Sequence, residues 1–383
     1  TAARALSARL AASDAAGPDF LAVHANAGHD IEAIRAAFAE TGARALHGGT
    51  SCRGVMASGG LAMGEGAGLG LFAIRDPEGA YGTGLAAQGS DPARAAREAT
   101  LAALDAAGRP GEAPALVWLT AAPGSEEAVI AGIEGVVGPN APVIGGSAAD
   151  GAVAGGWSVF AREGRLGDGV AVSVLFPSRP VSFAYQNGYT PAETRATVTE
   201  VEGRRLRALD GQPAAEVYGG WRDEALTPPA GAGPLPILSD STFHPLGRRL
   251  GEVAGVPFHL LAHPAAVHAD GSIELFATIR EGETVELMTG TADSLTARAG
   301  RVAALAARAG ALAPGDIAGA LMVYCGGCMM AVSDRIDGVA REVDGALGGA
   351  PWLGVFSFGE QGPVLDGRNR HGNLMISCVT FAR

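Results

Sequence analysis

A C-x-x-C motif formed by Cys325 and Cys328 is the part of the sequence best suited to chemistry. It follows an apolar stretch and encloses Gly326 and a second glycine, which free the backbone at the start of a predicted helix. A helix start favours a thiolate, because its dipole and unpaired N–H groups stabilise negative charge. The pair could therefore act as a redox couple, supply a nucleophile at Cys325, or bind a soft metal with a neighbouring methionine. Small buried cysteines packing a tight corner are the simpler interpretation.

The metal and haem hypotheses also depend on histidine. His263 is the candidate ligand, but spacings of four and five to His259 and His268 do not place all three on one face. Covalent c-type haem is excluded, because methionine stands where the histidine of C-x-x-C-H belongs. The metal candidates are therefore Cys325, Cys328 and His263, and neither a metal nor haem is assigned.

Two glycine-rich strand ends carry groups that suit a polar ligand. Their residues are Gly49, Thr50, Ser51 and Cys52 in one, and Gly146 and Ser147 in the other. Backbone N–H groups and hydroxyls at such corners bind carboxylate or phosphate. Both corners lack the lysine of a phosphate-binding loop and the G-x-G-x-x-G spacing, so nucleotide binding is not supported.

A third strand end places Glu360 directly after Gly359, and Asn373 begins the adjoining strand. The carboxylate can orient a ligand amine or act as a base, and the amide can fix a polar edge of the ligand. A solvated loop acid is the alternative. No G-x-S-x-G elbow supports serine catalysis, so the catalytic candidates are Cys325 and Glu360. We therefore expect a binding protein more than an enzyme.

A repeated pattern must position these residues. Strand, helix, strand ending in glycine, and strand recur three times, beginning near residues 20, 116 and 320. In the third copy, Ile336, Val339, Val343 and Leu347 form the apolar stripe of the helix. We predict an α/β protein with mixed sheets, and a binding crevice at the carboxyl ends of the parallel strands.

The 383 residues are enough for two ordinary cores. We predict an N-terminal helical extension at 1–19, a first domain at 20–215 and a second at 216–383. A β-meander near 256–288 precedes the third copy. Aromatic candidates for a pocket wall between the halves are Trp157, Tyr185, Tyr189 and Trp221.

Composition limits the partners. The net charge of −12 leaves no basic surplus for nucleic acid or an anionic membrane. The apolar runs are far shorter than the roughly 18 residues that a spanning helix needs, so no membrane segment is predicted. Four cysteines in so long a chain fit a reducing compartment, and we expect a cytoplasmic protein with a small-molecule or protein partner.

Several motifs in order resemble the FIST-domain family. They are Gly48-Gly-Thr-Ser-Cys-Arg-Gly54, Val143-Ile-Gly-Gly-Ser-Ala-Ala-Asp150, Leu209-Asp-Gly-Gln-Pro-Ala-Ala-Glu-Val-Tyr218, Tyr324-Cys-Gly-Gly327, Gly354-Val-Phe-Ser-Phe-Gly-Glu-Gln-Gly-Pro363 and His371-Gly-Asn373. The resemblance covers nearly the whole chain. It implies a FIST N-terminal domain followed by a FIST C-terminal domain, in a bacterial sensory module for small ligands. It also implies that some relatives are haem nitric-oxide sensors acting with histidine kinases or cyclic-di-GMP enzymes.

The sequence departs from the family pattern at two positions. The family shows a basic residue after its single cysteine, where this chain has Cys328, and an arginine near His263. Loss of two cations argues against an anionic amino-acid ligand. We predict that a small metabolite binds between the two domains near Cys52, Ser147, Cys325, Glu360 and Asn373, and that a separate partner reads the change. A haem gas sensor and an enzyme using Cys325 are the alternatives.

Overall fold

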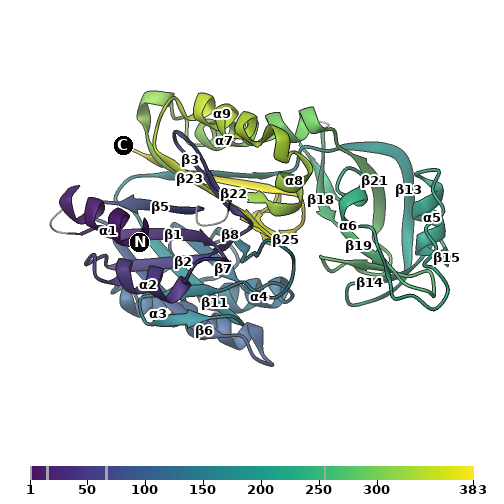
Figure 1. The fold of residues 1–383 in the computed structure, drawn as a ribbon, viewed down its shortest axis with the longest axis horizontal. Helices are drawn as coiled ribbons and strands as arrows, with labels where there is room; N and C mark the ends of the chain where they lie inside the picture. The colour runs from purple at the N-terminus through teal and green to yellow at the C-terminus, as the bar shows by residue number, and fades with distance from the viewer. Residues whose placement is uncertain (1, 14–16, 65–67, 254–255) are drawn as a thin grey trace.

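The structure, a computed structural model of the 383-residue chain, describes residues 2–13, 17–64, 68–253 and 256–383. Figure 1 shows two parts: a body of layered sheets flanked by helices, and a lobe made mostly of strands at one end. The lobe comprises residues 190–289, and the chain on either side of it builds the body.

The described body repeats one order of elements in three modules: strand, helix, parallel strand, hairpin and antiparallel strand. The first module is β1 (Phe20–Asn26), α2 (Ile31–Ala39), β2 (Ala45–Ser51), β3 (Gly54–Ala57), β4 (Gly60–Met63) and β5 (Leu69–Ile74). The second is β7 (Leu116–Ala121), α4 (Glu126–Val137), β8 (Val143–Ser147), β9 (Val159–Ala161), β10 (Gly164–Leu166) and β11 (Gly169–Phe176). The third is β22 (Ile317–Cys325), α9 (Ile336–Leu347), β23 (Trp352–Ser357), β24 (Glu360–Pro363), β25 (Asn369–Gly372) and β26 (Ile376–Ala382). The predicted mixed α/β fold with repeated modules is confirmed.

Each module extends the sheet of another module with its hairpin. The β3–β4 hairpin pairs with β23, β9–β10 pairs with β2, and β24–β25 pairs with β8. Two further strands add to the sheets: β6 (Ala80–Ala87) beside β11, and β12 (Val181–Gln186) beside β26. The third module is therefore hydrogen-bonded to both of the others, although more than a hundred residues of chain separate it from them.

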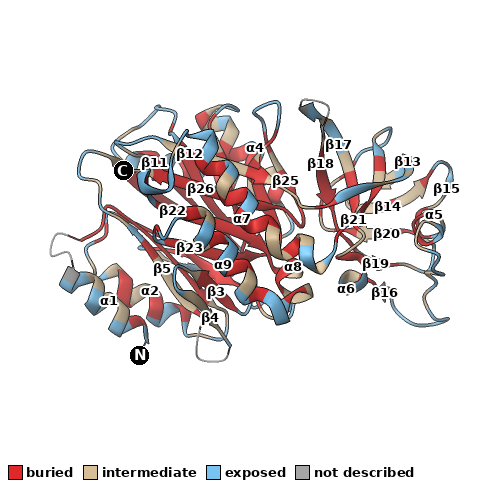
Figure 2. Cartoon of the chain, turned by 90° about the horizontal axis from the view of Figure 1, so that it is seen from above, coloured by how far each residue is buried: buried red, intermediate tan, exposed pale blue. Residues whose placement is uncertain are grey.

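Helices cover the outer faces of these sheets, and the sheets enclose a common core. Figure 2 shows buried strands inside and exposed outer helix faces. The helices that precede or accompany the modules are α1 (Ala2–Ser13), α3 (Pro92–Ala106), α7 (Ala292–Ala309) and the short α8 (Gly326–Ala331), with one-turn helices at Pro314–Asp316 and Ser333–Arg335. The predicted stripe of α9 is buried against the core. Among the described residues, no helix combines the length and apolarity needed to cross a membrane.

Glycine lets α3 lie directly on β6. A Cβ on Gly84 would stand 2.0 Å from the Ala99 carbonyl oxygen, so any larger residue would force the helix away from the strand.

The lobe has one sheet and its own core. Its elements are β13 (Thr190–Glu202), β14 (Arg205–Leu209), β15 (Gln212–Pro213), α5 (Ala214–Gly220), β16 (Leu235–Pro236), α6 (Leu238–Ser241), β17 (Leu246–Val253), β18 (Val256–Ala262), β19 (Pro264–Val267), β20 (Ile273–Leu275) and β21 (Thr284–Thr289). The predicted domain boundary after residue 215 falls inside this lobe, in α5, and it stays a prediction.

Candidate functional site

The site lies where strands of the second and third modules end together. Cys325 ends β22, and its neighbour across the parallel ladder is Ser357, at the end of β23. Ser147 ends β8 and is tied to the turn after β23, because its N–H donates to Gly359 O at 2.8 Å. Glu360 then pairs with Gly146 in the adjoining antiparallel ladder. Crossed modules thus bring the carboxyl ends of the strands to one place, as expected of α/β binding sites.

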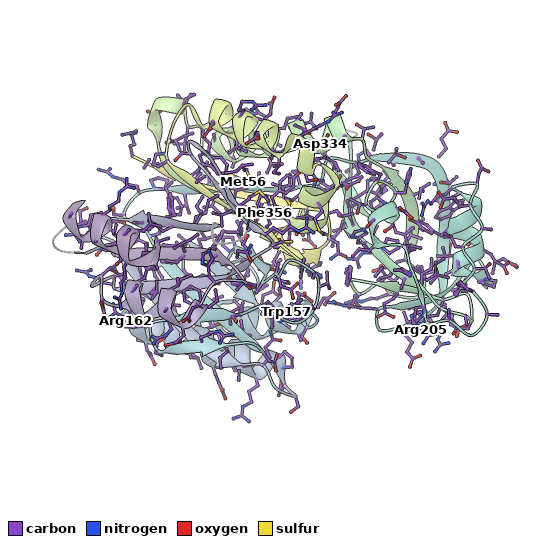
Figure 3. All side chains as sticks on the ribbon, in the orientation of Figure 1. Met56, Trp157, Arg162, Arg205, Asp334 and Phe356 are labelled. Atoms are coloured by element: carbon purple, nitrogen blue, oxygen red, sulfur yellow. The ribbon has the colours of Figure 1, made fainter. Side chains whose placement is uncertain are left out.

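A cavity of about 220 Å³ opens at these strand ends, between the body and the lobe. Its lining residues are Pro123, Gly124, Glu126, Val153, Trp157, Arg204, Leu238, His263, Phe276, Cys325, Gly327, Met330, Ser357, Phe358, Gly359 and Asn373. Figure 3 labels Trp157 on the side of the body that faces the lobe, and its ring meets Phe358 edge-on at 6.3 Å. The wall is mainly apolar, with polar groups at few positions.

An ion-pair network joins body to lobe at the rim. Arg204 Nη2, from the lobe, lies 2.6 Å from Glu126 Oε2 and 2.7 Å from Glu127 Oε2 at the start of α4. Ser147 Oγ donates to Glu126 Oε1 at 2.7 Å. Burial acts to raise the pKa of Glu126, but the charges of His371 and Arg204 outweigh it and hold the pKa below its usual value. Glu126 is therefore an ionised carboxylate on the cavity wall.

His263 of the lobe and Asn373 of the body form another polar part of the wall. His263 N–H donates to Asn373 Oδ1 at 3.1 Å, and His263 Nε2 lies 3.0 Å from Leu238 O. Burial lowers the pKa of His263 to about 4. At neutral pH this imidazole is uncharged, and Nε2–H donates to the Leu238 carbonyl.

Glu360 lies behind the cavity wall. Ser357 Oγ donates to Glu360 Oε1 at 2.7 Å, and Met375 N–H donates to Oε2 at 2.9 Å. Burial nevertheless raises the pKa of Glu360 to about 8, since these hydrogen bonds offset only part of the lost hydration. Glu360 is thus predominantly a neutral acid at pH 7.

The two cysteines have unequal thiols. Cys325 is at the cavity wall, and its hydrogen bond to Cys328, followed by burial, raises its pKa well above the usual value. Cys328 is fully buried, and burial acts to raise its pKa as well. The hydrogen bond from Cys325 and the charge of Arg298 outweigh burial and lower the pKa of Cys328. The anionic sulfur therefore sits one layer beneath the cavity.

Family models match most of the chain. The FIST N domain matches residues 19–212 and the FIST C domain matches residues 214–363. The chain belongs to the FIST family. No curated protein matches it closely enough to count as a relative. FIST domains are associated with sensing of small ligands in signalling proteins, and here the cavity is lined from both matched regions.

The structure brings part of the predicted FIST site to the cavity and part behind it. Cys325, His263, Gly359 and Asn373 line the cavity. In the described part of the chain, the predicted residues that do not line it are Gly49, Thr50, Ser51, Cys52, Gly146, Ser147, Gly326, Cys328 and Glu360.

The corner at residues 49–52 joins modules and does not contact the cavity. Ser51 Oγ accepts from Phe356 N–H at 2.8 Å, and Thr50 Oγ1 accepts from Ser158 N–H at 3.0 Å. Cys52 N–H donates to Phe356 O at 2.9 Å. These polar groups are therefore occupied in holding the first module to the other two.

Sequence reasoning missed Arg204, Leu238 and Phe276, which the lobe contributes, and Glu126, which the body contributes. The two glutamates at the start of α4 could have indicated a polar group of the site, because Ser147 was already a candidate ligand-binding residue. Of the aromatic candidates, Trp157 lines the cavity, while Tyr185 and Tyr189 contact Glu360 and Cys328 behind it.

The cavity does not fit haem. Its volume of about 220 Å³ is smaller than the roughly 300–1,000 Å³ of pockets that hold drug-sized ligands. A porphyrin is a ligand of at least that size class. The Nε2 atom of His263 is also engaged with Leu238 O. Among the residues that the structure describes, no group of three or more His, Cys, Asp or Glu side chains could hold a metal ion.

Proposed function

We propose that this FIST protein is a sensory protein that binds a small metabolite in the cavity between body and lobe and signals to a separate partner. The observation that carries the proposal is that one cavity is walled by both parts, with Cys325 and Glu126 from the body and His263 and Phe276 from the lobe. A ligand touching both parts binds their closed arrangement more tightly than an open one. Its binding therefore shifts the population toward the closed state.

The wall favours a neutral or cationic ligand with an apolar body. Glu126 and Glu127 both have lowered pKa values, so two carboxylates face the single guanidinium of Arg204. Among the residues that the structure describes, no surplus positive charge remains on this rim for an anionic ligand, whereas an amine or amide could approach Glu126 and the Asn373 side chain. The rings of Phe276, Phe358 and Trp157 supply apolar contact.

The partner is proposed on the family resemblance. A histidine kinase or a cyclic-di-GMP enzyme would read the relative position of body and lobe. The ion pair between Arg204 and Glu126 is the contact placed to report that position, since its two ends belong to the two parts.

The test compares ligand binding in the wild type with a variant whose cavity is filled. Gly327 lines the cavity, and a Cβ there would meet its neighbours at 3.6 Å or more, so Gly327→Leu adds a side chain without a backbone clash. Gly345→Leu, on the exposed side of α9, is the matched control because a Cβ there meets nothing within 4 Å.

Native mass spectrometry of the purified protein, followed by a thermal-shift screen of neutral and cationic metabolites, should reveal a ligand that stabilises the wild type and Gly345→Leu. Gly327→Leu should bind that ligand at least tenfold more weakly than the wild type. Equal binding by both variants would place the ligand elsewhere, and a Soret band in the purified protein would favour haem instead.

A further inference from the structure

Arg298 is a buried cation without an ordinary counter-ion. Its side chain, on α7, is 1% exposed. Nη1 donates to Leu374 O at 3.0 Å, but Nε and Nη2 have no hydrogen-bond partner among the described residues. The guanidinium lies over the rings of Tyr189 and Tyr324, 5.3 Å from each centroid. Because arginine cannot shed its proton, a neighbouring group must carry the compensating charge.

The titratable groups that face Arg298 from the surrounding elements are Tyr189, Tyr324, Cys325, Cys328 and Glu360. Burial raises the pKa values of both tyrosines, and the pKa of Cys325 is raised as well, so these three are neutral. Cys328 is the group whose pKa is lowered, and Tyr189 Oη lies 3.5 Å from its sulfur. The Tyr189 side chain thus contacts both the Arg298 guanidinium and the Cys328 sulfur, and this shared contact assigns Cys328 as the counter-ion of Arg298.

Glu360 is a second group able to take this role. Arg298 Nη1 donates to Leu374 O while Met375 N–H donates to Glu360 Oε2, so the two side chains hold opposite ends of one peptide group. Leu374 has a φ of 55°, a conformation uncommon for leucine, which fixes this peptide group in a strained turn. The Cys328 charge helps to keep Glu360 protonated, and Arg298 acts in the opposite direction.

We propose that Cys325 and Cys328 form a redox modification site for peroxide-class oxidants, in which Glu360 replaces Cys328 as the counter-ion of Arg298 when the disulfide forms. The site does not depend on which metabolite the cavity binds. Arg298 stabilises the reduced thiolate, which makes the disulfide a strong oxidant, so the pair stays reduced until a peroxide arrives.

The reaction starts at the cavity wall. Cys325 passes its proton to the Cys328 thiolate, and the resulting Cys325 thiolate attacks one peroxide oxygen. An S–O bond forms, the O–O bond breaks, and the departing hydroxide recovers the proton from Cys328 as water. The Cys328 thiolate then attacks the Cys325 sulfenic acid, so the S–S bond forms and a second hydroxide leaves.

Glu360 completes the charge transfer by giving its proton to that second hydroxide. In total, one thiol, one thiolate, one protonated carboxyl and one hydrogen peroxide become a disulfide, a carboxylate and two waters. The sulfurs lose two electrons to the peroxide oxygens, and the charge beside Arg298 stays at one negative unit throughout.

The first experiment measures thiolate absorption in the far ultraviolet for the reduced full chain at pH 7. The wild type should contain one thiolate per chain that Cys328→Ser lacks, and Cys378→Ser should match the wild type. Cys378 suits as a control because it is buried and burial raises its pKa to about 12. Identical spectra for the wild type and Cys328→Ser would overturn the assignment, without any need for an Arg298 variant.

The second experiment titrates the same proteins with hydrogen peroxide in a pH-stat. Mass spectrometry should find a disulfide between Cys325 and Cys328 that costs the chain two hydrogens. The wild type should take up no net proton per disulfide, whereas Glu360→Gln should take up one. Equal proton uptake in both proteins would overturn the role of Glu360, and oxidation of Cys325 beyond sulfenic acid without a disulfide would overturn the site.

Discussion

Arg204 Nη2 of the lobe lies 2.6 Å from Glu126 Oε2 of the body, at the rim of the cavity. The Glu126 side chain is 2% exposed and that of Arg204 18%, so both ends of this ion pair are largely removed from water. The same arginine also reaches Glu127, whose Oε1 accepts from Thr278 N–H at 2.8 Å in the lobe. Two consecutive carboxylates at the start of α4 thus connect the parts that we propose a ligand brings together.

Replacing Arg204 should destabilise the chain. Arg204→Ala leaves Glu126 buried without its partner, and loss of one member of such a pair costs about 3 kcal/mol. Arg205→Ala is the matched control, because Arg205 pairs with the exposed Asp270 on the lobe surface. Urea unfolding should show a loss near that size for Arg204→Ala and under about 1 kcal/mol for Arg205→Ala. Equal losses would show that the ion pair at the rim contributes no more to stability than the exposed pair of Arg205.

The acid dependence of stability should follow the same network. Burial acts to raise the pKa of Glu127, but the charges of His371 and Arg204 lower it to about 2. A carboxyl whose folded pKa is depressed stabilises the fold above its unfolded value, and that stability disappears as pH falls from about 4.5 toward 2. The free energy of unfolding of the wild type should fall across this window. If the free energy of unfolding of Arg204→Ala fell as steeply with decreasing pH, Arg204 would not be the group that lowers the pKa of Glu127.

Because of Glu360, we expect the free energy of unfolding to depend on pH in the opposite direction at higher pH. Its pKa is raised from 4.5 to about 8, so between these values the unfolded chain loses a proton that the folded chain keeps. Stability from this group is therefore complete below about pH 4.5 and declines as pH rises toward 8. Glu360→Gln should remove that decline, and its stability relative to the wild type should increase by about 1.4 kcal/mol per pH unit. Thermal or urea unfolding from pH 5 to 8 measures this difference, with the exposed Glu342→Gln as the control.

Local patterns in the sequence predicted the modules well. The stripe of Ile336, Val339, Val343 and Leu347 has the helical period and is buried as that period requires. Cys325, which lines the cavity, was predicted as a site residue because the ends of parallel strands are where α/β folds place ligands. Asn373, which also lines the cavity, was predicted from its place at the start of the adjoining strand. Each inference needed only residues close together in the chain.

Contacts made by distant segments could not be predicted in this way. Arg298 sits on an Ala-rich helix and looks like a surface residue, yet it is fully buried because Tyr189 and Tyr324 converge on it from elsewhere in the chain. Arg204 and Phe276 reach the cavity only through the pairing of the lobe strands. The exchange of hairpins between modules could not be predicted either, because the local sequence of a hairpin does not determine which sheet edge it will pair with.

Asn369 offers a direct test of this exchange. It lies on β25 of the third module, but its side chain binds the second: Oδ1 accepts from Val143 N–H at 2.8 Å, and Nδ2 donates to Ala141 O and Glu134 Oε1, each at 3.0 Å. Asn369→Ala leaves the buried Val143 N–H and Ala141 carbonyl groups without partners, which should lower the free energy of unfolding by about 2 kcal/mol.

The control is Asn140→Ala, because Asn140 is exposed on the neighbouring turn and should change stability by less than about 0.5 kcal/mol. Hydrogen exchange should become faster in β24, β25 and β8 together in Asn369→Ala, since these strands are neighbours in one sheet. Faster exchange confined to β24 and β25, with β8 as protected as in the wild type, would show that the hairpin does not stabilise the sheet it joins. In that case the third module would contact the second without supporting it, and Glu360 would lose the rigid frame that holds it beside Ser357 and Met375.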